Sequence, residues 1–399
     1  MSRSWIPIAA VGALIFMGAV LLPSPQELRV APLDRYGTAI ASGAVPYRDF
    51  SIEYPPGALP PIALPAFVPR VSYTAAFRAL EAMLGCLVVI CVAFLLRDAS
   101  PRERLTRVAL VAAMPLLLGP VVFVRYDLWP TVLVLLSLVT LVQARVRVAG
   151  GFLGAAIAAK LYPAVLLAPL ILGAEHQQAG HGKRALKAVI VAFAVFMLPF
   201  GVLAPGGLAW SLLQQGGRGL QLESVPASVI AVLSLYGAGP YTTSFEHGAY
   251  DLHGPGVAVV VAVTSMLGIG AIALMWRWLW RHRDHPPAPV VVYAGSVAIV
   301  VVFAKVLSPQ YLIWLVPLVA LVRGQRGAFA AAALAFAMLF SRVLYPSHYE
   351  GLVALQSGPV LLLAARNLLV VAAAVLLIRQ ALQRQQQPAA VAAAGVATV

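Results

Sequence analysis

The stretch "GGFLGAAIAAKLYPAVLLAPLIL", residues 150–172, decides how this chain folds, because Lys160 and Pro163 interrupt an otherwise apolar run. Its length suits a single membrane-spanning helix, which needs about 20 apolar residues. One uninterrupted crossing would, however, place the basic loop "GHGKRALK" (180–187) on the outer side of the membrane. Because basic loops stay on the cytoplasmic side, the stretch is predicted to form two segments that meet below the outer surface.

The same pattern recurs in "AIVVVFAKVLSPQYLIWLVPLVALVRG", residues 298–324, where Lys305 and Pro309 interrupt the run. Proline fits the first turn of a helix, and a helix N-terminus attracts anions. An ionisable residue at membrane depth is by default a functional hypothesis. We therefore expect Lys160 and Lys305 to bind an anion. The alternative is that each lysine snorkels to the interface or pairs with a carboxylate.

The composition indicates a polytopic membrane protein. The chain has 399 residues, of which 61% are hydrophobic and 11% are charged, whereas a soluble domain carries about 25% charged residues. We predict one all-α integral membrane domain over residues 1–380, followed by a disordered cytoplasmic tail over 381–399. About twelve segments are expected, over residues 6–22, 72–96, 107–124, 128–143, 148–159, 161–172, 187–205, 256–276, 288–304, 310–322, 327–343 and 359–379.

The net charge of +14 comes from basic clusters between these segments. Such clusters mark the cytoplasmic ends of membrane helices, so the bilayer, and not nucleic acid, is the expected partner. The assignment puts both termini in the cytoplasm of a plasma-membrane protein. Residues 6–22 are expected to be a retained helix, because no signal-peptide cleavage site follows them. Cys86 and Cys91 are expected to be core residues, with no disulfide or metal between them.

Most acidic residues fall on the outer side in this topology, which indicates a polar site there. The first outer loop, residues 23–71, carries Glu27, Asp34, Asp49 and Glu53, and its prolines stiffen the backbone. A rigid, acid-rich loop over the outer leaflet suits a general base. The alternative is a solvated loop in which these acids pair with neighbouring arginines.

Other outer segments add polar groups. Arg125 and Asp127 in "RYD" form either a local ion pair or part of the site. Arg218, Gln221 and Glu223 follow a Gly-Gly pair and are suited to hold the hydroxyls and phosphate of a sugar-lipid. Residues 226–236 are too short to span the bilayer and are expected on the surface. Two arginines at membrane depth, Arg342 and Arg366, need a partner or a polar cavity.

Five motifs together resemble the actinobacterial branch of glycosyltransferase family 87, whose members are membrane transferases of the polyprenol-phosphate-mannose type with the GT-C fold. The motifs cover nearly the whole chain, and they are specific for the family but not for a substrate. They are "GAVPYRDFSIEYPPGALP" (43–60), "RYDLWP" (125–130), "AAKLYPAVLLAPLIL" (158–172), "QGGRGLQLES" (215–224) and "KVLSPQYLIWLVPL" (305–318).

The resemblance implies a polyprenyl-phosphate sugar donor, with mannose expected, and an active site facing outward. It also implies that a carboxylate in the first outer loop is the catalytic base. The family's acidic element ahead of PYRDF is altered here, because the matching position is Arg29 and the nearest carboxylates are Glu27 and Asp34. We rank Asp34 first as the base and Glu27 second, with Asp49 and Glu53 more easily explained as structural.

Polyprenyl phosphate is a good leaving group, so the transition state needs cations at the developing phosphate charge and one base for the acceptor hydroxyl. The sequence offers Lys160, Lys305, Arg218 and Arg366, with Gln310, for the donor phosphate. The remaining substrate-binding candidates are Tyr54, Arg125, Asp127, Gln221, Glu223, Ser308, Tyr311 and Arg342.

No cofactor and no obligatory metal are expected, since the outer histidines are scattered and "FEHGAYDLH" (245–253) is a weak metal candidate. The acceptor is expected to be an extracytoplasmic glycolipid or glycan. Two alternatives stay open: a transporter or lipid-linked-sugar flippase, since broken helices with buried lysines also occur in transporters, and a non-catalytic scaffold in envelope assembly.

Overall fold

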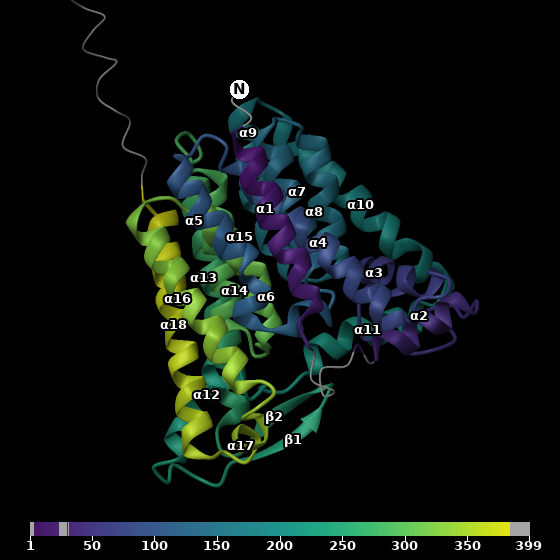
Figure 1. The fold of residues 1–399 in the computed structure, drawn as a ribbon, viewed down its shortest axis with the longest axis vertical. Coiled ribbons are helices and arrows are strands. Elements are labelled where there is room, and N and C mark those ends of the chain that lie inside the picture. Colours follow the sequence, from purple (N-terminus) through teal and green to yellow (C-terminus); the bar gives the residue numbers. More distant parts are fainter. Residues whose placement is uncertain (1–3, 24–29, 31, 384–399) are drawn as a thin grey trace, which may run out of the picture.

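The computed structural model describes residues 4–23, 30 and 32–383, and several of its long helices, including α16 and α18, run along the long axis of the molecule (Figure 1). Glu27 and residues 384–399 of the predicted tail lie outside the described residues. The α-helices are α1 (Trp5–Gly18), α2 (Leu33–Ala41), α3 (Leu59–Ala63), α4 (Tyr73–Leu95), α5 (Pro101–Ala112), α6 (Met114–Leu118), α7 (Leu128–Val142), α8 (Val146–Ala159), α9 (Leu167–Gln177), α10 (His181–Leu203), α11 (Pro205–Gly217), α12 (Val225–Ser234), α13 (Val257–Arg281), α14 (Pro289–Phe303), α15 (Leu312–Leu321), α16 (Gly324–Leu344), α17 (Tyr349–Val353) and α18 (Ser357–Ala381).

Short 3₁₀ helices and one hairpin complete the described chain. The 3₁₀ helices are η1 (Ala19–Leu21), η2 (Pro56–Ala58), η3 (Leu64–Phe67), η4 (Pro120–Phe123), η5 (Tyr162–Leu166) and η6 (Pro309–Tyr311), and the strands are β1 (Thr242–Glu246) and β2 (Ala249–His253). The strands pair antiparallel, with Thr242 opposite His253. The hairpin and α17 lie at the end of the molecule opposite α5 and α9 (Figure 1).

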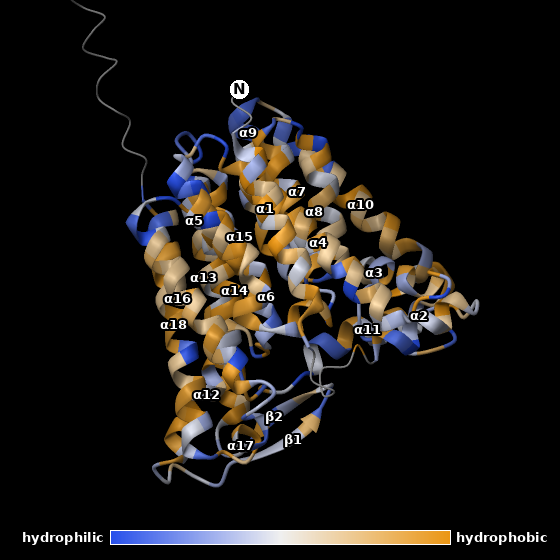
Figure 2. Ribbon diagram, viewed as in Figure 1, coloured by the Kyte–Doolittle hydropathy of each residue, from blue (hydrophilic) through white to orange (hydrophobic). Residues whose placement is uncertain are grey.

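The predicted all-α polytopic membrane architecture is confirmed. Five helices in the described chain, α4, α10, α13, α16 and α18, are long and apolar enough to cross a membrane. Figure 2 shows hydrophobic residues along the length of these helices and hydrophilic residues gathered toward the helix ends. The predicted segment 72–96 corresponds closely to α4, and 359–379 corresponds to α18.

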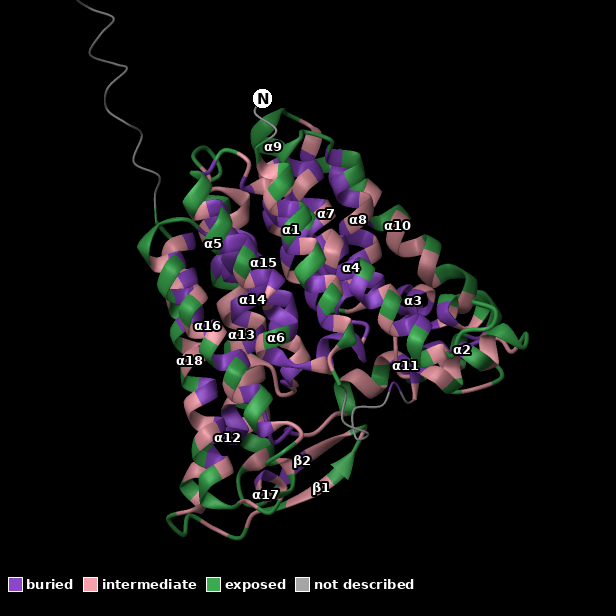
Figure 3. Cartoon of the chain, viewed as in Figure 1, coloured by how far each residue is buried: buried purple, intermediate pink, exposed green. Residues whose placement is uncertain are grey.

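Both predicted helix breaks are present. Helix α8 ends at Ala159 because Lys160 adopts an extended backbone (φ −159°, ψ 142°), and the chain then turns through η5 into α9. Helix α14 likewise ends at Phe303, and the chain resumes as η6 and α15 after a non-helical stretch that contains Lys305. All residues of α15 are buried, which puts the second break next to the centre of the bundle (Figure 3).

Close helix packing depends on small residues. Gly150 and Gly154 lie on the face of α8 that contacts α10, and a Cβ atom at either would overlap a backbone carbonyl oxygen of α10, that of Ala185 or Val189. Small residues four apart let two helix backbones approach each other in a bilayer, where dispersion contacts replace the hydrophobic driving force. This contact holds the arm that leads to Lys160 against α10.

One expectation is corrected. The predicted segment 107–124 is not one helix: it is α5, α6 and η4, because Pro115 and Pro120 lack a backbone donor and Gly119 has a positive φ of 86°. The segment 226–236, expected on the surface, has an exposed face that includes Val229 and Leu233. As α12 it packs against α18 and buries one face, including Ala227 and Ile230.

Three outer elements were not predicted. Helix α2 lies inside the first outer loop, and α11 lies in a glycine-rich stretch that the sequence reads as a loop. The β1–β2 hairpin turns at His247 and Gly248, both with positive φ (49° and 75°). Two consecutive positive φ values define the tight turn whose twist matches a hairpin, so "EHGA" was a readable hairpin signal.

Candidate functional site

A polar cavity of about 690 Å³ is formed between the β1–β2 hairpin, α17 and the Lys305 break. It brings together five of the residues predicted from the sequence, which are Arg125, Gln221, Glu223, Ser308 and Gln310. The other lining residues are Val121, Phe245, Gly248, Ala249, Tyr250, Pro309, Tyr345, Pro346, Ser347, Tyr349 and Glu350. We call this space the Glu223 cavity.

Gln221 joins the 218–224 loop to the second break. Its backbone N–H donates to the Lys305 carbonyl at 2.9 Å, and its side-chain oxygen accepts from the Leu307 N–H at 2.7 Å. Its amide nitrogen donates to Ser308 Oγ at 2.9 Å and to Glu223 Oε2 at 3.1 Å. Gln221 is buried, so these hydrogen bonds form away from competing water and hold the 218–224 loop against the second break.

Glu223 is the buried acid of the cavity. Only 5% of its surface is exposed, and Tyr349 Oη donates to Oε2 at 3.3 Å. Burial raises the pKa of Glu223 to about 7, against the opposing influence of Arg366 and of the Tyr349 hydrogen bond. A carboxyl group with that pKa is able to exchange a proton near neutral pH.

Arg366 contacts Glu223 from α18 and does not line the cavity. Its Nη2 donates to the Glu223 carbonyl at 3.1 Å and lies 3.9 Å from Glu223 Oε1. Arg366 is fully buried, so the partner expected for an arginine at this depth is present. Arg342 donates to the Leu116 carbonyl and is likewise absent from the cavity lining.

The second cluster surrounds Lys160. Lys160 Nζ donates to Asp127 Oδ1 at 2.5 Å, and Trp314 Nε1 donates to the same oxygen at 2.7 Å. The ammonium also lies 4.7 Å from the ring centroids of Tyr311 and Trp314 and 5.0 Å from that of Tyr126. Aromatic faces stabilise a desolvated cation. Asp127 pairs with Lys160, which is the carboxylate pairing given as the alternative expectation for this lysine.

Lys305 and Arg218 lie between the cavity and the first outer loop. Lys305 Nζ donates to the Gly216 carbonyl at 2.5 Å. Arg218 Nη2 donates to Glu53 Oε2 at 3.0 Å and to the His247 carbonyl at 3.3 Å. Burial lowers the pKa of Lys305, and the nearby charges of Asp251 and Arg218 act on it in opposite directions. The two cations remain partly exposed, with Glu53 and Asp251 as neighbouring carboxylates.

The acids of the first outer loop have separate roles. Asp49 is bound by Arg48 Nε at 2.9 Å and accepts from the Val45 N–H at 2.8 Å, and these bonds lower its pKa to about 2. Asp34 lies in the first turn of α2 and accepts from the N–H of Arg35. Neither Asp34, Asp49 nor Glu53 lines the Glu223 cavity. Tyr54 contributes its carbonyl to Tyr47 Oη and packs on Tyr126.

One group of side chains has the spacing of a metal site. Ligand atoms of Glu246, His247 and Asp251 lie within 4.8 Å of one another on the hairpin. Asp251 Oδ2 already accepts from the Gly219 N–H at 3.2 Å, and Glu246 Oε1 lies 3.2 Å from His253 Nε2. The three ligands suit a divalent cation in number and type, but Arg218 and Lys305 hold positive charge beside them.

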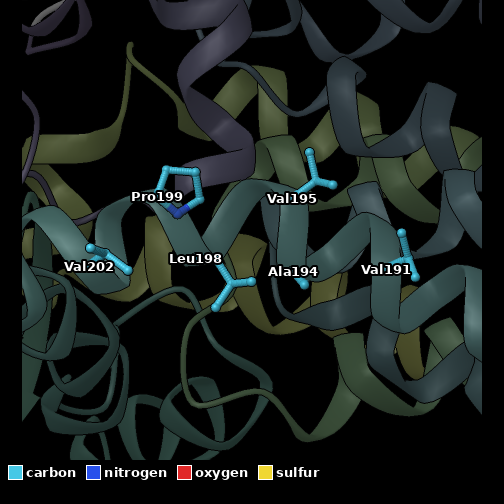
Figure 4. A pocket seen from close by; sticks show the side chains of 6 residues that line it. All are labelled: Val191, Ala194, Val195, Leu198, Pro199 and Val202. Atoms are coloured by element: carbon cyan, nitrogen blue, oxygen red, sulfur yellow. The ribbon is translucent and has the colours of Figure 1, made fainter.

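A separate apolar groove of about 600 Å³ runs along α10 (Figure 4). Its lining consists of Val191, Ala194, Val195, Leu198, Pro199 and Val202. It offers no side chain that can donate or accept a proton. An apolar helix face of this kind is suited to contact with lipid chains.

The fold and the cavity define a multi-pass membrane protein with a polar site beside the β1–β2 hairpin and α17. The sequence model of glycosyltransferase family 87 matches residues 52–309, so the chain belongs to that family. Among solved structures, the chain is similar to ArnT from Cupriavidus metallidurans bound to undecaprenyl phosphate, with a TM-score of 0.47 and 15% identity over 96% of this chain and 78% of that one. No curated protein matches the chain.

Proposed function

We propose that this glycosyltransferase moves a sugar, with mannose as the first candidate, from a polyprenyl-phosphate donor to an extracytoplasmic glycolipid or glycan, with inversion at the anomeric carbon. The observation that carries the proposal is the Glu223 cavity, a polar space built on the broken end of an apolar helix pair. A substrate with a long apolar chain and a polar sugar-phosphate matches that junction, since its tail stays in lipid while its head enters the cavity.

The cations near the cavity fit the charge that develops during transfer. When the anomeric C–O bond breaks, negative charge grows on the phosphate, and preorganised cations stabilise it. Arg125 lines the cavity, and Lys305 lies in the break that forms one wall. Arg218 lies in the 218–224 loop, and the Gln221 N–H of this loop donates to the Lys305 carbonyl in that wall. The enclosed Lys160 supports the assignment less well, because Asp127 already neutralises it.

The proposed orientation places the cavity outside the cell. The basic residues of "GHGKRALK" and of the end of α13 mark the inner side. Cysteines introduced at exposed Lys183 and exposed Asp49, with Cys86 and Cys91 replaced by alanine, test this. An impermeant thiol reagent added to intact cells is expected to label position 49 and to leave position 183 unlabelled. Labelling at position 183 would reverse the orientation.

The activity is tested with purified protein in lipid nanodiscs. The assay supplies radiolabelled polyprenyl-phosphate mannose, or the glucose equivalent, together with a lipid and glycan extract of the cell envelope. Release of polyprenyl phosphate coupled to labelling of an acceptor is the expected result. Movement of intact donor across sealed vesicles without bond cleavage would instead support a flippase. Mass spectrometry of envelope glycolipids after gene deletion then identifies the acceptor.

A further inference from the structure

We propose that Glu223, and not an acid of the first outer loop, is the base that accepts the proton of the acceptor hydroxyl. The inference rests on the proposed sugar transfer. Among the residues that the structure describes, two carboxylates line the cavity, Glu223 and the exposed Glu350. A base must lie within hydrogen-bond reach of the hydroxyl that it deprotonates, and of these two only Glu223 is held in place by buried partners.

The surroundings of Glu223 fix the direction of its carboxylate. Gln221 Nε2 and Tyr349 Oη both donate to Oε2, at 3.1 and 3.3 Å. Arg366 approaches from α18, 3.9 Å from Oε1, and Asn367 Nδ2 donates to the Glu223 carbonyl at 3.3 Å. Contacts from three different elements therefore hold one acid against the cavity, which is the preorganisation that proton transfer requires.

The acids of the first outer loop are less suited to this role. Asp49 is held by Arg48, and its pKa of about 2 makes it a weak base. Glu53 is bound to Arg218 at 3.0 Å. Asp34 lies on α2 and does not line the cavity. Burial, by contrast, raises the pKa of Glu223 to about 7.

The proposed step is a single displacement. The acceptor oxygen forms a bond to the anomeric carbon as the bond from that carbon to the phosphate oxygen breaks, and the leaving polyprenyl phosphate takes the electron pair. The hydroxyl proton passes to Glu223 and is later released to solvent. The titratable and charged groups around this acid are Arg366 from α18, the neutral phenol of Tyr349 and the carboxyl of Glu350 from α17, and Arg125 in the cavity lining.

The decisive variant is Glu223→Gln, compared with Glu350→Gln from the same cavity. A general base contributes about 10²- to 10⁴-fold to the rate. We expect Glu223→Gln to lose transfer by that factor while its affinity for polyprenyl phosphate stays within about threefold, because the base acts in the transition state. Glu350→Gln is expected to lose less than about tenfold.

The pH dependence separates catalysis from structure. Glu223 must be deprotonated to act, so wild-type transfer should fall about tenfold per pH unit below pH 7. Tyr349→Phe removes a hydrogen bond that favours the charged form of Glu223, so the fall in transfer rate at acidic pH should begin at a higher pH. This measurement remains possible if Glu223→Gln folds poorly. An acidic fall in rate that is the same in Tyr349→Phe and in the wild type would overturn the assignment.

Two further outcomes distinguish failure of the base assignment from failure of the proposed function. If Glu223→Gln keeps more than a tenth of the wild-type rate while Asp34→Asn, Asp49→Asn or Glu53→Gln is inactive and binds polyprenyl phosphate normally, the base lies in the first outer loop. If the wild-type protein cleaves no polyprenyl-phosphate sugar under any of these conditions, the proposed function is wrong and the assignment of Glu223 is wrong with it.

Discussion

The two helix breaks share one sequence pattern, an apolar arm followed by a lysine and a proline, yet the structure surrounds the two lysines differently. Lys160 is enclosed by Asp127 and three aromatic rings, and its side chain is 18% exposed. Lys305 remains partly open and donates to a single backbone carbonyl, that of Gly216. From this comparison we expect the lysine that meets a carboxylate and aromatic faces to be structural, and the lysine that meets a backbone carbonyl to be the one that binds a ligand.

The largest expected effect is on the enclosed lysine. Lys160→Ala leaves Asp127 as an unpaired buried charge, and breaking a buried pair costs about 3–5 kcal/mol. The measurement is the thermal unfolding midpoint of the purified protein in detergent, which should fall well below that of the wild type. The matched control is Lys160→Met with Asp127→Leu, which removes both charges and should recover part of the loss. A single variant as stable as the wild type would show that Lys160 is not structural.

A smaller effect, on catalysis, is expected at the open lysine. Lys305→Ala should leave the unfolding midpoint nearly unchanged and lower kcat/KM for the donor by about 10- to 100-fold, the effect of losing one charged hydrogen bond worth about 1.5–3 kcal/mol. Lys305→Arg, which keeps the charge, should retain more activity. If the two breaks behave alike, with Lys305→Ala unfolding as readily as Lys160→Ala, the contrast between them is wrong.

Loss of the ion pair between Glu53 of the first outer loop and Arg218 should change donor use less than loss of Lys305 does. Glu53→Gln removes the carboxylate from Arg218, but both side chains are partly exposed, at 29% and 17%. Such pairs contribute at most about 1 kcal/mol. We expect a change in donor KM of less than about fivefold. A larger change would place Arg218, ahead of Lys305, as the main phosphate contact.

The smallest effect is expected at Asp49. Its hydrogen bonds to Arg48 and Val45 lower its pKa to about 2, so the carboxyl favours the folded state when charged. That contribution is present above the unfolded pKa of about 3.9 and is lost only as pH falls toward 2. Asp49→Asn should therefore lower the unfolding midpoint slightly and by a constant amount between pH 5 and 8, with activity unchanged, measured by the same assays. An inactive, folded Asp49→Asn protein would make this acid the base.

The long apolar helices could be predicted from the sequence, because apolar length and flanking charge mark the segments able to cross a bilayer. The two breaks were predicted for the same reason, since only a break keeps both basic loops on one side. Helix α11 was missed because glycine, which is frequent in its sequence, disfavours helix interiors. Helix α2 was missed because it is short, although its nine residues are amphipathic. The fragmentation of 107–124 was also missed, although Pro115 and Gly119 were visible.

The candidate site was predicted in part. Gln221, Glu223, Ser308, Gln310 and Arg125 were all selected as polar residues of outer segments, and the cavity gathers them. The sequence did not indicate that Tyr349 and Tyr250 would join them, because that depends on which outer loops fold over one another. For the same reason it did not pair Asp127 with Lys160, 33 positions away. The assignment of Glu223, and not an acid of the first outer loop, as the base stays a prediction.

The buried contact between Glu223 and Arg366 has a consequence for how the protein is made. Its two members are 143 positions apart, and Arg366 lies in α18, the last of the candidate spans. A ribosome delivers the acid long before the arginine, so the nascent chain holds an unmatched carboxyl until α18 leaves the translocon. Inserting an unpaired arginine at the centre of a membrane helix costs at least about 2.5–3.5 kcal/mol. The carboxyl and carbonyl groups of Glu223, which are already in place, reduce that cost. Completion of the Glu223 cavity and entry of the final helix are therefore expected to be one coupled event in biogenesis.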